Sequence, residues 1–345
     1  MSYFVKDGFM FSFDLKSGYH HVDIAQEHQT FLGFSWPAPD SIKEIFYVFT
    51  VLPFGLSSAP WVFTKVLKPL EKYWGVQGLC IAIFLDHGWA IVQDRESCRT
   101  KARAVRADLC NAGFVVNEDK SVWEPTQVLD WLGITWNAAL GTFKIVERRI
   151  VKIINSIDHI IEADFKVSAR ELSSFTGQVI STGPVVGNIG GRIMTRQCPL
   201  STSCGDNWDS ISLLDDYCKE ELYFWKENMV NINTRYCFVS KVRSYFVYSD
   251  ASATGGGAII DFNNDFVCHK TWSENEKGQS STWRELSVIE FSLQSFASVL
   301  EGSHVNWFTD SQVAAKIVEV GSMKLGLHKM ARRIFDICIL SGIPI

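Results

Sequence analysis

The sequence predicts an α+β protein of two or three domains, from its length, its composition and a change of hydrophobic periodicity along the chain. The 345 residues are enough for more than one domain. Hydrophobic residues make up 47% and charged residues 21%, which is typical of a globular protein with an ample core. Short apolar strands and helices alternate at first, helical spacing then dominates, and strands return near the end.

Residues 1–140 predict a mixed region of strands and helices. Helices are expected at Ala59–Tyr73 and Ser97–Gly113, the second with an Asn-Ala-Gly stop. Apolar runs on both sides of Asp86–Gly88 predict a hairpin with Gly88 in its turn. The expected strands are Phe9–Leu15, Thr30–Phe34, Ile45–Val51, Cys80–Leu85 and Trp89–Val92.

The next hundred residues are mainly helical. Isoleucines recur at helical spacing from Ile150 to Ile161, which predicts an amphipathic helix. Ser168-Ala-Arg-Glu171 is a capping box that begins another helix. Further along, the sequence predicts a glycine-rich loop at Pro184–Arg192, a polar linker at 197–211 and a helix at Leu213–Met229.

From Ser244 the pattern predicts an α/β layer arrangement. The expected order is strands at Tyr245–Ser249, Gly257–Ile260 and Phe266–Trp272, a helix at Thr282–Leu300, a strand at Val305–Thr309, and a helix after Asp310.

Composition narrows the class of protein. No apolar run reaches the length of a transmembrane helix, and the N-terminus lacks the blocks of a signal peptide. The nine cysteines include no CxxC pair, so free thiols are favoured over a structural zinc site. Free thiols in turn favour an intracellular location, cytoplasmic or nuclear. The net charge of −5 counts slightly against nucleic-acid binding, although acidic metal sites can mask a basic face.

Asp14 and Asp86 are the first candidate metal ligands. Asp14 ends an apolar strand, and Asp86 lies at the tip of the predicted hairpin, so the two carboxylates could share a metal ion. Taken alone, each is better explained as an ordinary turn residue, because Asp is common in turns.

Five sequence motifs occur around these aspartates in the order Phe13–Tyr19, Leu52–Pro60, Phe84–His87, Gly113–Ser121 and Trp131–Gly133. They resemble the palm of reverse transcriptases from retroelements. The motifs are most similar to those of DIRS-like (tyrosine-recombinase) retrotransposons, and gypsy-like elements are close.

The resemblance implies roles for the matching positions. Asp14 and Asp86 would bind two Mg²⁺ or Mn²⁺ ions. Tyr19 would stack under the incoming sugar and exclude a 2′-hydroxyl, Phe54 and Gly55 would line the nucleotide pocket, and Lys120 would lie near the triphosphate. The alternatives are a core tyrosine, a core phenylalanine and a solvated lysine.

His87 departs from the family pattern, which has a second aspartate at this position of the hairpin. Imidazole suits Mg²⁺ poorly, so the substitution implies an impaired polymerase, from an element decaying in a host genome. Some activity could persist if Asp86 does most of the metal binding. A sequencing or gene-model error is the other explanation.

Asp250, Glu285 and Asp310 form a second candidate site. An Asp at a strand end, a Glu on the following helix and an Asp at the next strand end resemble the ribonuclease H domain of retroelements over residues 244–345. The resemblance implies that they hold two metal ions for attack of water on an RNA phosphate. Alternatively, Glu285 is a first-turn acid, Asp310 is a helix N-cap, or Glu290 takes the role of Glu285.

Together these resemblances predict the domain order and the partners. Few residues precede Asp14, so we expect the fingers to be largely missing, and the chain ends before the family's fourth ribonuclease H carboxylate. The expected partners are an RNA template, a DNA primer, an RNA–DNA hybrid and deoxynucleoside triphosphates, with no membrane. A catalytically dead nucleic-acid-binding relic, or a ribonuclease H alone, is the alternative. The predicted domains are a palm with residual fingers at 1–140, thumb-like helices at 141–195, a connection at 196–243 and an incomplete ribonuclease H-like domain at 244–345.

Overall fold

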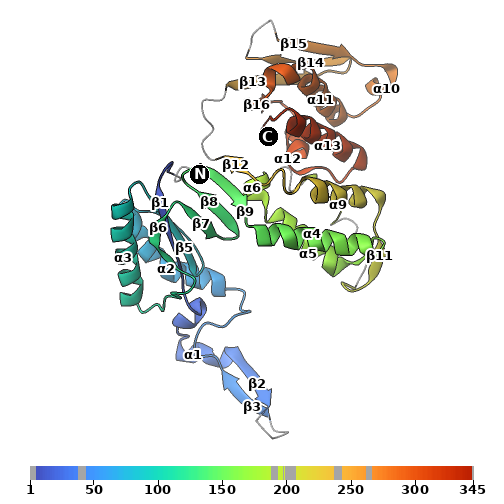
Figure 1. Ribbon diagram of the computed structural model, residues 1–345. Helices are drawn as coiled ribbons and strands as arrows, with labels where there is room; N and C mark the ends of the chain where they lie inside the picture. The colour runs from blue at the N-terminus through green and yellow to red at the C-terminus, as the bar shows by residue number, and fades with distance from the viewer. Residues whose placement is uncertain are drawn as a thin grey trace. The chain divides into compact units, whose positions relative to one another are not determined.

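The computed structural model describes residues 5–37, 44–187, 193–196, 198, 207–236, 243–261 and 266–343. The chain divides into two compact units, Met1–Phe143 and Lys144–Ile345, and each is described by itself (Figure 1). No described helix is both long enough and apolar enough to cross a membrane.

An antiparallel sheet with the strand order β4-β5-β1-β6 is the centre of the first unit. Alternate residues of β1 pack on opposite faces, because Phe11 and Phe13 belong to one core cluster and Met10 belongs to another. Both faces of β1 are therefore covered, which explains its almost unbroken apolar sequence. The strands are β1 (Phe9–Asp14), β4 (Cys80–Phe84), β5 (His87–Val92) and β6 (Val122–Thr126), and the long helices are α2 (Ala59–Val76) and α3 (Arg95–Asn111).

The strand predicted at Thr30–Phe34 was placed too early. Thr30–Leu32 forms the short 3-10 helix η2, and the strand β2 is Gly33–Pro37, which pairs with β3 (Glu44–Val48). Both strands of this ribbon are exposed along their whole length, so burial did not fix their limits. The smaller elements of this unit are η1 (Gly18–His21), α1 (Gln26–Gln29), β7 (Val128–Trp131) and β8 (Ile134–Asn137), and β9 (Thr142–Ile145) spans the boundary between the units.

The second unit begins with helices. The predicted isoleucine helix is α4 (Glu147–Glu162), with Ile150, Ile153, Ile157 and Ile160 buried. The predicted capping box is confirmed, because Ser168 and Glu171 cap each other at the start of α5 (Ala169–Ile180). β10 (Lys166–Ser168), just before it, pairs with β11 (Ile211–Leu213).

Two predictions in this region were wrong. The helix predicted from Leu213 begins only at α9 (Asp216–Asn228), because Asp215 caps it and Leu213 belongs to β11. The predicted loop at Pro184–Arg192 overlaps the short helix α6 (Gly183–Val186), which has a proline in its first turn. Residues 188–192 of that loop, 197 and 199–206 of the predicted linker, and 237–242 lie outside the described residues. β12 (Arg235–Tyr236) follows α9.

The last part of the second unit is a sheet with the order β15-β14-β13-β16, covered by helices (Figure 1). β13 pairs antiparallel with β14 and parallel with β16, and α11 packs against β13 and β14. The predicted strands and the long helix are confirmed here. The elements are β13 (Ser244–Ala251), β14 (Gly255–Ile260), β15 (Val267–Thr271), α10 (Glu274–Lys277), α11 (Ser281–Leu300), β16 (His304–Phe308), α12 (Gln312–Val320) and α13 (Leu325–Leu340).

Candidate active sites

The β4–β5 hairpin places Asp86 beside Asp14. Phe84 pairs with His87, so the turn consists of Leu85 and Asp86. The φ angle of Leu85 is 54°, a costly conformation for a residue other than glycine. The amide of Leu15 donates to the carbonyl of Asp86 at 2.9 Å, which fixes the tip against the end of β1.

Gly88 lies in β5 and not in the turn, so its predicted place was wrong. It lies directly opposite Phe13 in the ladder between β1 and β5. A Cβ atom on Gly88 would be 2.1 Å from the Phe13 ring, so the missing side chain gives this ring its space. The glycine is required by packing, which the local turn pattern could not reveal.

His87 contacts both aspartates. Its Nδ1 is 2.8 Å from Asp14 Oδ2, and its Nε2 is 3.6 Å from Asp86 Oδ1. The first distance is that of a hydrogen bond, and the second is too long for one. The Asp14 side chain is only 9% exposed, against 35% for Asp86. The imidazole is therefore the partner of a nearly buried carboxylate.

Tyr19 and Phe54 lie together close to this centre. Their ring centroids are 5.0 Å apart, and Tyr19 also packs edge-on against the ring of Phe63 at 5.3 Å. A Cβ atom on Gly18 would be 2.9 Å from Asp86 Cβ, so the glycine lets this aromatic pair approach the hairpin tip. Phe54 remains 66% exposed, so one face of the pair is open to solvent.

The other two predicted nucleotide-binding residues, Gly55 and Lys120, are both exposed. Gly55 is exposed and has a φ of 87°. Lys120 is exposed in the turn that follows Asn117. Two hydrogen bonds connect this turn to the backbone of Asp14. The Asp14 amide donates to Ser121 Oγ at 3.1 Å, and the Asn117 amide donates to the Asp14 carbonyl at 2.8 Å.

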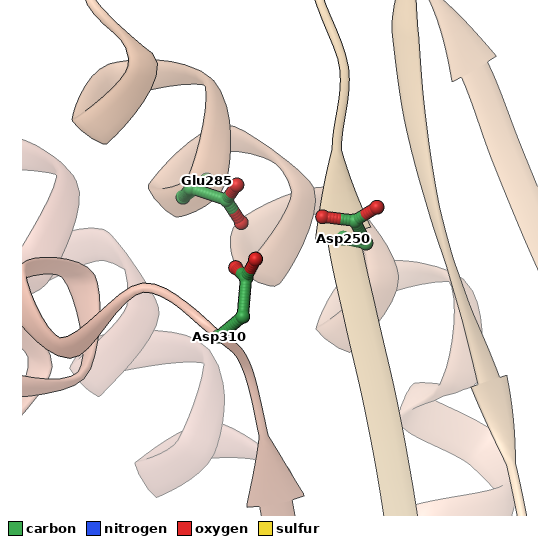
Figure 2. Close-up of side chains that lie close together, drawn as sticks. All are labelled: Asp250, Glu285 and Asp310. Atoms are coloured by element: carbon green, nitrogen blue, oxygen red, sulfur yellow. The ribbon is translucent and has the colours of Figure 1, made fainter.

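Asp250, Glu285 and Asp310 converge in the second unit (Figure 2). The parallel ladder pairs Tyr248 with Phe308, so Asp250 and Asp310 leave the same edge of the sheet, each two residues further on. One ligand atom from each of the three carboxylates lies within 4.8 Å of the others, and no other group of this kind occurs among the described residues.

Gly256 explains how Glu285 reaches the sheet. A Cβ atom on this glycine would be 2.3 Å from Val288 Cγ2, so α11 can approach β14 only because the side chain is missing. Glu285 is three residues before Val288 and therefore lies on the same helix face. The glycine run thus brings the glutamate to the edge where the strands end.

The alternatives for the second site are excluded by geometry. The first turn of α11 contains no acidic residue, so Glu285 is not a first-turn acid. Ser311 caps α12, so Asp310 is not the N-cap. Glu290 pairs with Arg333 at 2.5 Å and is not part of the carboxylate group.

The electrostatics of the second site favour a cation. Burial, together with the charges of Asp310 and Asp250, raises the pKa of Glu285 above its ordinary value. Its Oε2 is buried and has no hydrogen-bond partner among the described residues. Three carboxylates with an unsatisfied oxygen match the oxygen ligands that Mg²⁺ and Mn²⁺ prefer.

Comparison with known proteins bears on both units. Residues 6–136 match the family described as reverse transcriptase (RNA-dependent DNA polymerase). This segment is therefore similar to a reverse transcriptase domain. No curated protein sequence matches the chain.

Solved structures with a similar fold include a foamy viral protease-reverse transcriptase "dRH" in complex with double-stranded DNA, with a TM-score of 0.51, 14% identity and 99% of this chain covered. A foamy viral protease-reverse transcriptase in complex with an RNA/DNA hybrid gives a TM-score of 0.52 at 14% identity, with 97% of this chain covered. The chain spans 57% and 43% of the length of these proteins. The likeness shows a shared mixed α+β, reverse transcriptase-like fold.

The carboxylates of the reverse transcriptase-like domain fit a metal ion less well than those of the second unit. Asp14 and Asp86 are the predicted ligands of divalent cations, but the imidazole of His87 is within contact distance of both carboxylates. The resemblance predicted that His87 stands where the family has an acid. It did not show the contact with Asp14, which depends on their direct pairing across β1 and β5.

Proposed function

We propose that the chain is a retrotransposon reverse transcriptase with a ribonuclease H, of a DIRS-like or gypsy-like element. Its best supported activity is cleavage of the RNA strand of an RNA–DNA hybrid. The observation that carries this proposal is the convergence of Asp250, Glu285 and Asp310 within 4.8 Å, together with the unpartnered buried oxygen of Glu285. A purely structural cluster of acids would be expected to have basic partners.

Each carboxylate has a distinct place in the proposed reaction. Glu285 is 5% exposed and would anchor the inner side of the site, whereas Asp250 and Asp310 are exposed and would face the approaching phosphate. All three would hold Mg²⁺ or Mn²⁺. When bound, two such ions supply an activated water and stabilise the charge that develops on the phosphate.

The reverse transcriptase-like domain supplies the second part of the proposal, RNA-directed DNA polymerisation. Asp14 and Asp86 are its proposed metal ligands, and the paired rings of Tyr19 and Phe54 are proposed to contact the nucleotide. Gly55 and Lys120 are proposed to complete the nucleotide pocket. Because His87 stands where the family has an acid, we expect this activity to be impaired.

The nucleic-acid partners are proposed on the same basis. The solved relatives are complexes with double-stranded DNA and with an RNA/DNA hybrid. For this chain the proposed ligands are an RNA template with a DNA primer, their hybrid product and deoxynucleoside triphosphates. A catalytically dead relic that binds such duplexes is the second candidate, favoured by His87.

The test is cleavage of a hybrid with an end-labelled RNA strand, in Mg²⁺ and in Mn²⁺. The natural chain should cut the RNA, and Asp250→Asn and Asp310→Asn should each lose at least about 100-fold of the rate. Glu290→Gln is the matched control, because Glu290 lies on the same helix but pairs with Arg333. Hybrid binding without cleavage would favour the relic, and cleavage that survives both Asp variants would refute the assignment.

A further inference from the structure

We infer that the imidazole of His87 occupies the position of a divalent cation between Asp14 and Asp86 and closes this centre to metal ions. The inference rests on the proposed assignment of these two aspartates. It concerns a site other than the one proposed for RNA cleavage, so the two can fail separately.

The distances do not allow a ring and a cation together. An Mg²⁺ ion bound by both aspartates would lie about 2.1 Å from an oxygen of each. One ring nitrogen of His87 is 2.8 Å from Asp14 Oδ2 and the other is 3.6 Å from Asp86 Oδ1, so the ring spans the gap between the two carboxylates. A cation can enter only if the ring leaves.

The backbone fixes the ring in this place. His87 lies directly opposite Asp14 in the ladder between β5 and β1, and directly paired side chains share one face of a sheet. On the next position, Gly88 packs under Phe13 and keeps the two strands in this register. The contact therefore follows from the fold and does not depend on a freely moving surface side chain.

Movement of the His87 ring out of this gap would also be unfavourable, because Asp14 would lose its hydrogen-bond partner. This carboxylate is nearly buried, and the contact with His87 is the only side-chain contact of Asp14 within hydrogen-bond distance that we find among the described residues. Moving the ring away would leave a buried acceptor unsatisfied, which carries a desolvation penalty. An N–H on Nδ1 satisfies Asp14 in the neutral ring as well as in the charged one, so the closed state needs no added proton.

This arrangement predicts that divalent cations bind only at the second centre of the natural chain. Removing the ring should open the first centre, and an acid in its place should give a cation a third carboxylate. A neutral side chain that still donates to Asp14 should open it less.

The experiment measures Mn²⁺ binding by electron paramagnetic resonance of the free ion. It uses the full chain with Asp250→Asn, Glu285→Gln and Asp310→Asn, so that only the first centre can respond. In this background we compare natural His87 with His87→Asp, His87→Ala and His87→Asn. The control is His28→Ala, because His28 is exposed in the same domain. Among the described residues, its one ion pair is with the neighbouring Glu27.

With natural His87 and with His28→Ala we expect no Mn²⁺ bound at the first centre. His87→Asp should bind one ion, at least about 10-fold more tightly than His87→Ala. Circular dichroism identifies variants that fail to fold, and His87→Asn should bind the ion more weakly than His87→Ala, or more weakly than His87→Asp if His87→Ala unfolds. Equal binding by the chain with natural His87 and by the His87→Asp variant would overturn the inference, and so would no binding by any folded variant. Neither result bears on RNA cleavage by the chain with its second centre intact.

Discussion

Replacing Glu285 by glutamine should stabilise the metal-free chain while abolishing RNA cleavage. The side chain is 5% exposed and lies with Asp250 and Asp310 in a group whose ligand atoms are within 4.8 Å. At that distance two like charges repel by about 3.5 kcal/mol at an effective dielectric constant of 20. Solvent screens the two exposed aspartates, so we expect a net gain of about 1–3 kcal/mol in the free energy of unfolding.

The sign of the pH dependence follows from the raised pKa of Glu285. A carboxyl group whose pKa is higher in the folded state favours folding while it is protonated, below its unfolded pKa of about 4.3. That contribution is lost as the pH rises through the raised pKa of the folded state. The advantage of Glu285→Gln over the natural chain should therefore be small near pH 4 and greatest near pH 7.

Urea unfolding in EDTA at both pH values measures this difference, and Mg²⁺ should reduce it, because the ion stabilises only the chain that binds it. Glu290→Gln is the control: it breaks the ion pair with Arg333, so it should lower stability by about 0.5–1 kcal/mol and leave cleavage intact. A destabilised Glu285→Gln chain at pH 7, or one that still cleaves RNA, would refute the reasoning.

Three further predictions concern the first domain and the buried thiols. His87→Asp should extend a primer on an RNA template with Mg²⁺ or Mn²⁺ while the natural chain does not, and equal extension by both would show that the second hairpin acid is dispensable. Gly88→Ala should lose about 1–3 kcal/mol or more in urea unfolding, because its Cβ would be 2.1 Å from the Phe13 ring; an unchanged midpoint would contradict the packing. Burial raises the pKa of Cys98 to about 11 and that of Cys338 to about 12, so mass spectrometry after labelling with a thiol reagent at pH 8 should find both unmodified and the exposed Cys110 modified.

The sequence predicts best what depends on neighbours along the chain. The isoleucine spacing of α4 and the capping box of α5 are local patterns, and both are present as predicted. The exposed ribbon of β2 and β3 was placed less well, because no buried face fixes where its strands begin. Leu213 has a helical pattern around it but pairs with Lys166, a partner distant in sequence.

For the candidate sites too, the sequence predicted some residues, whereas other contacts could be found only in the structure. Asp250 and Asp310 were predicted from their order along the chain, which resembles that of a ribonuclease H, and the parallel pairing of β13 with β16 accounts for their position at the same edge of the sheet. The choice between Glu285 and Glu290 required the close approach of α11 at Gly256, and Glu290 is accounted for by Arg333 on a helix far along the chain. The contact of His87 with Asp14 likewise depends on strand register, which the composition of either strand does not specify.

The two carboxylate centres should respond differently to divalent cations. Asp14 has the imidazole of His87 as its partner, whereas none of the ion pairs found among the described residues includes Asp250, Glu285 or Asp310. Among the described residues, no basic side chain therefore offsets the charge of the second centre before a cation binds. Mg²⁺ at about 100 times its dissociation constant would stabilise it by about 2.7 kcal/mol. Where amides exchange by unfolding of the second unit, hydrogen exchange in β13 and α11 should slow by about 100-fold, while β1 and β5 stay unchanged. Protection of β1 and β5 in the natural chain would mean that a cation enters the first centre despite His87. In the His87→Asp variant, by contrast, we expect the cation to protect β1 and β5 as well, because a third carboxylate replaces the ring that kept the ion out.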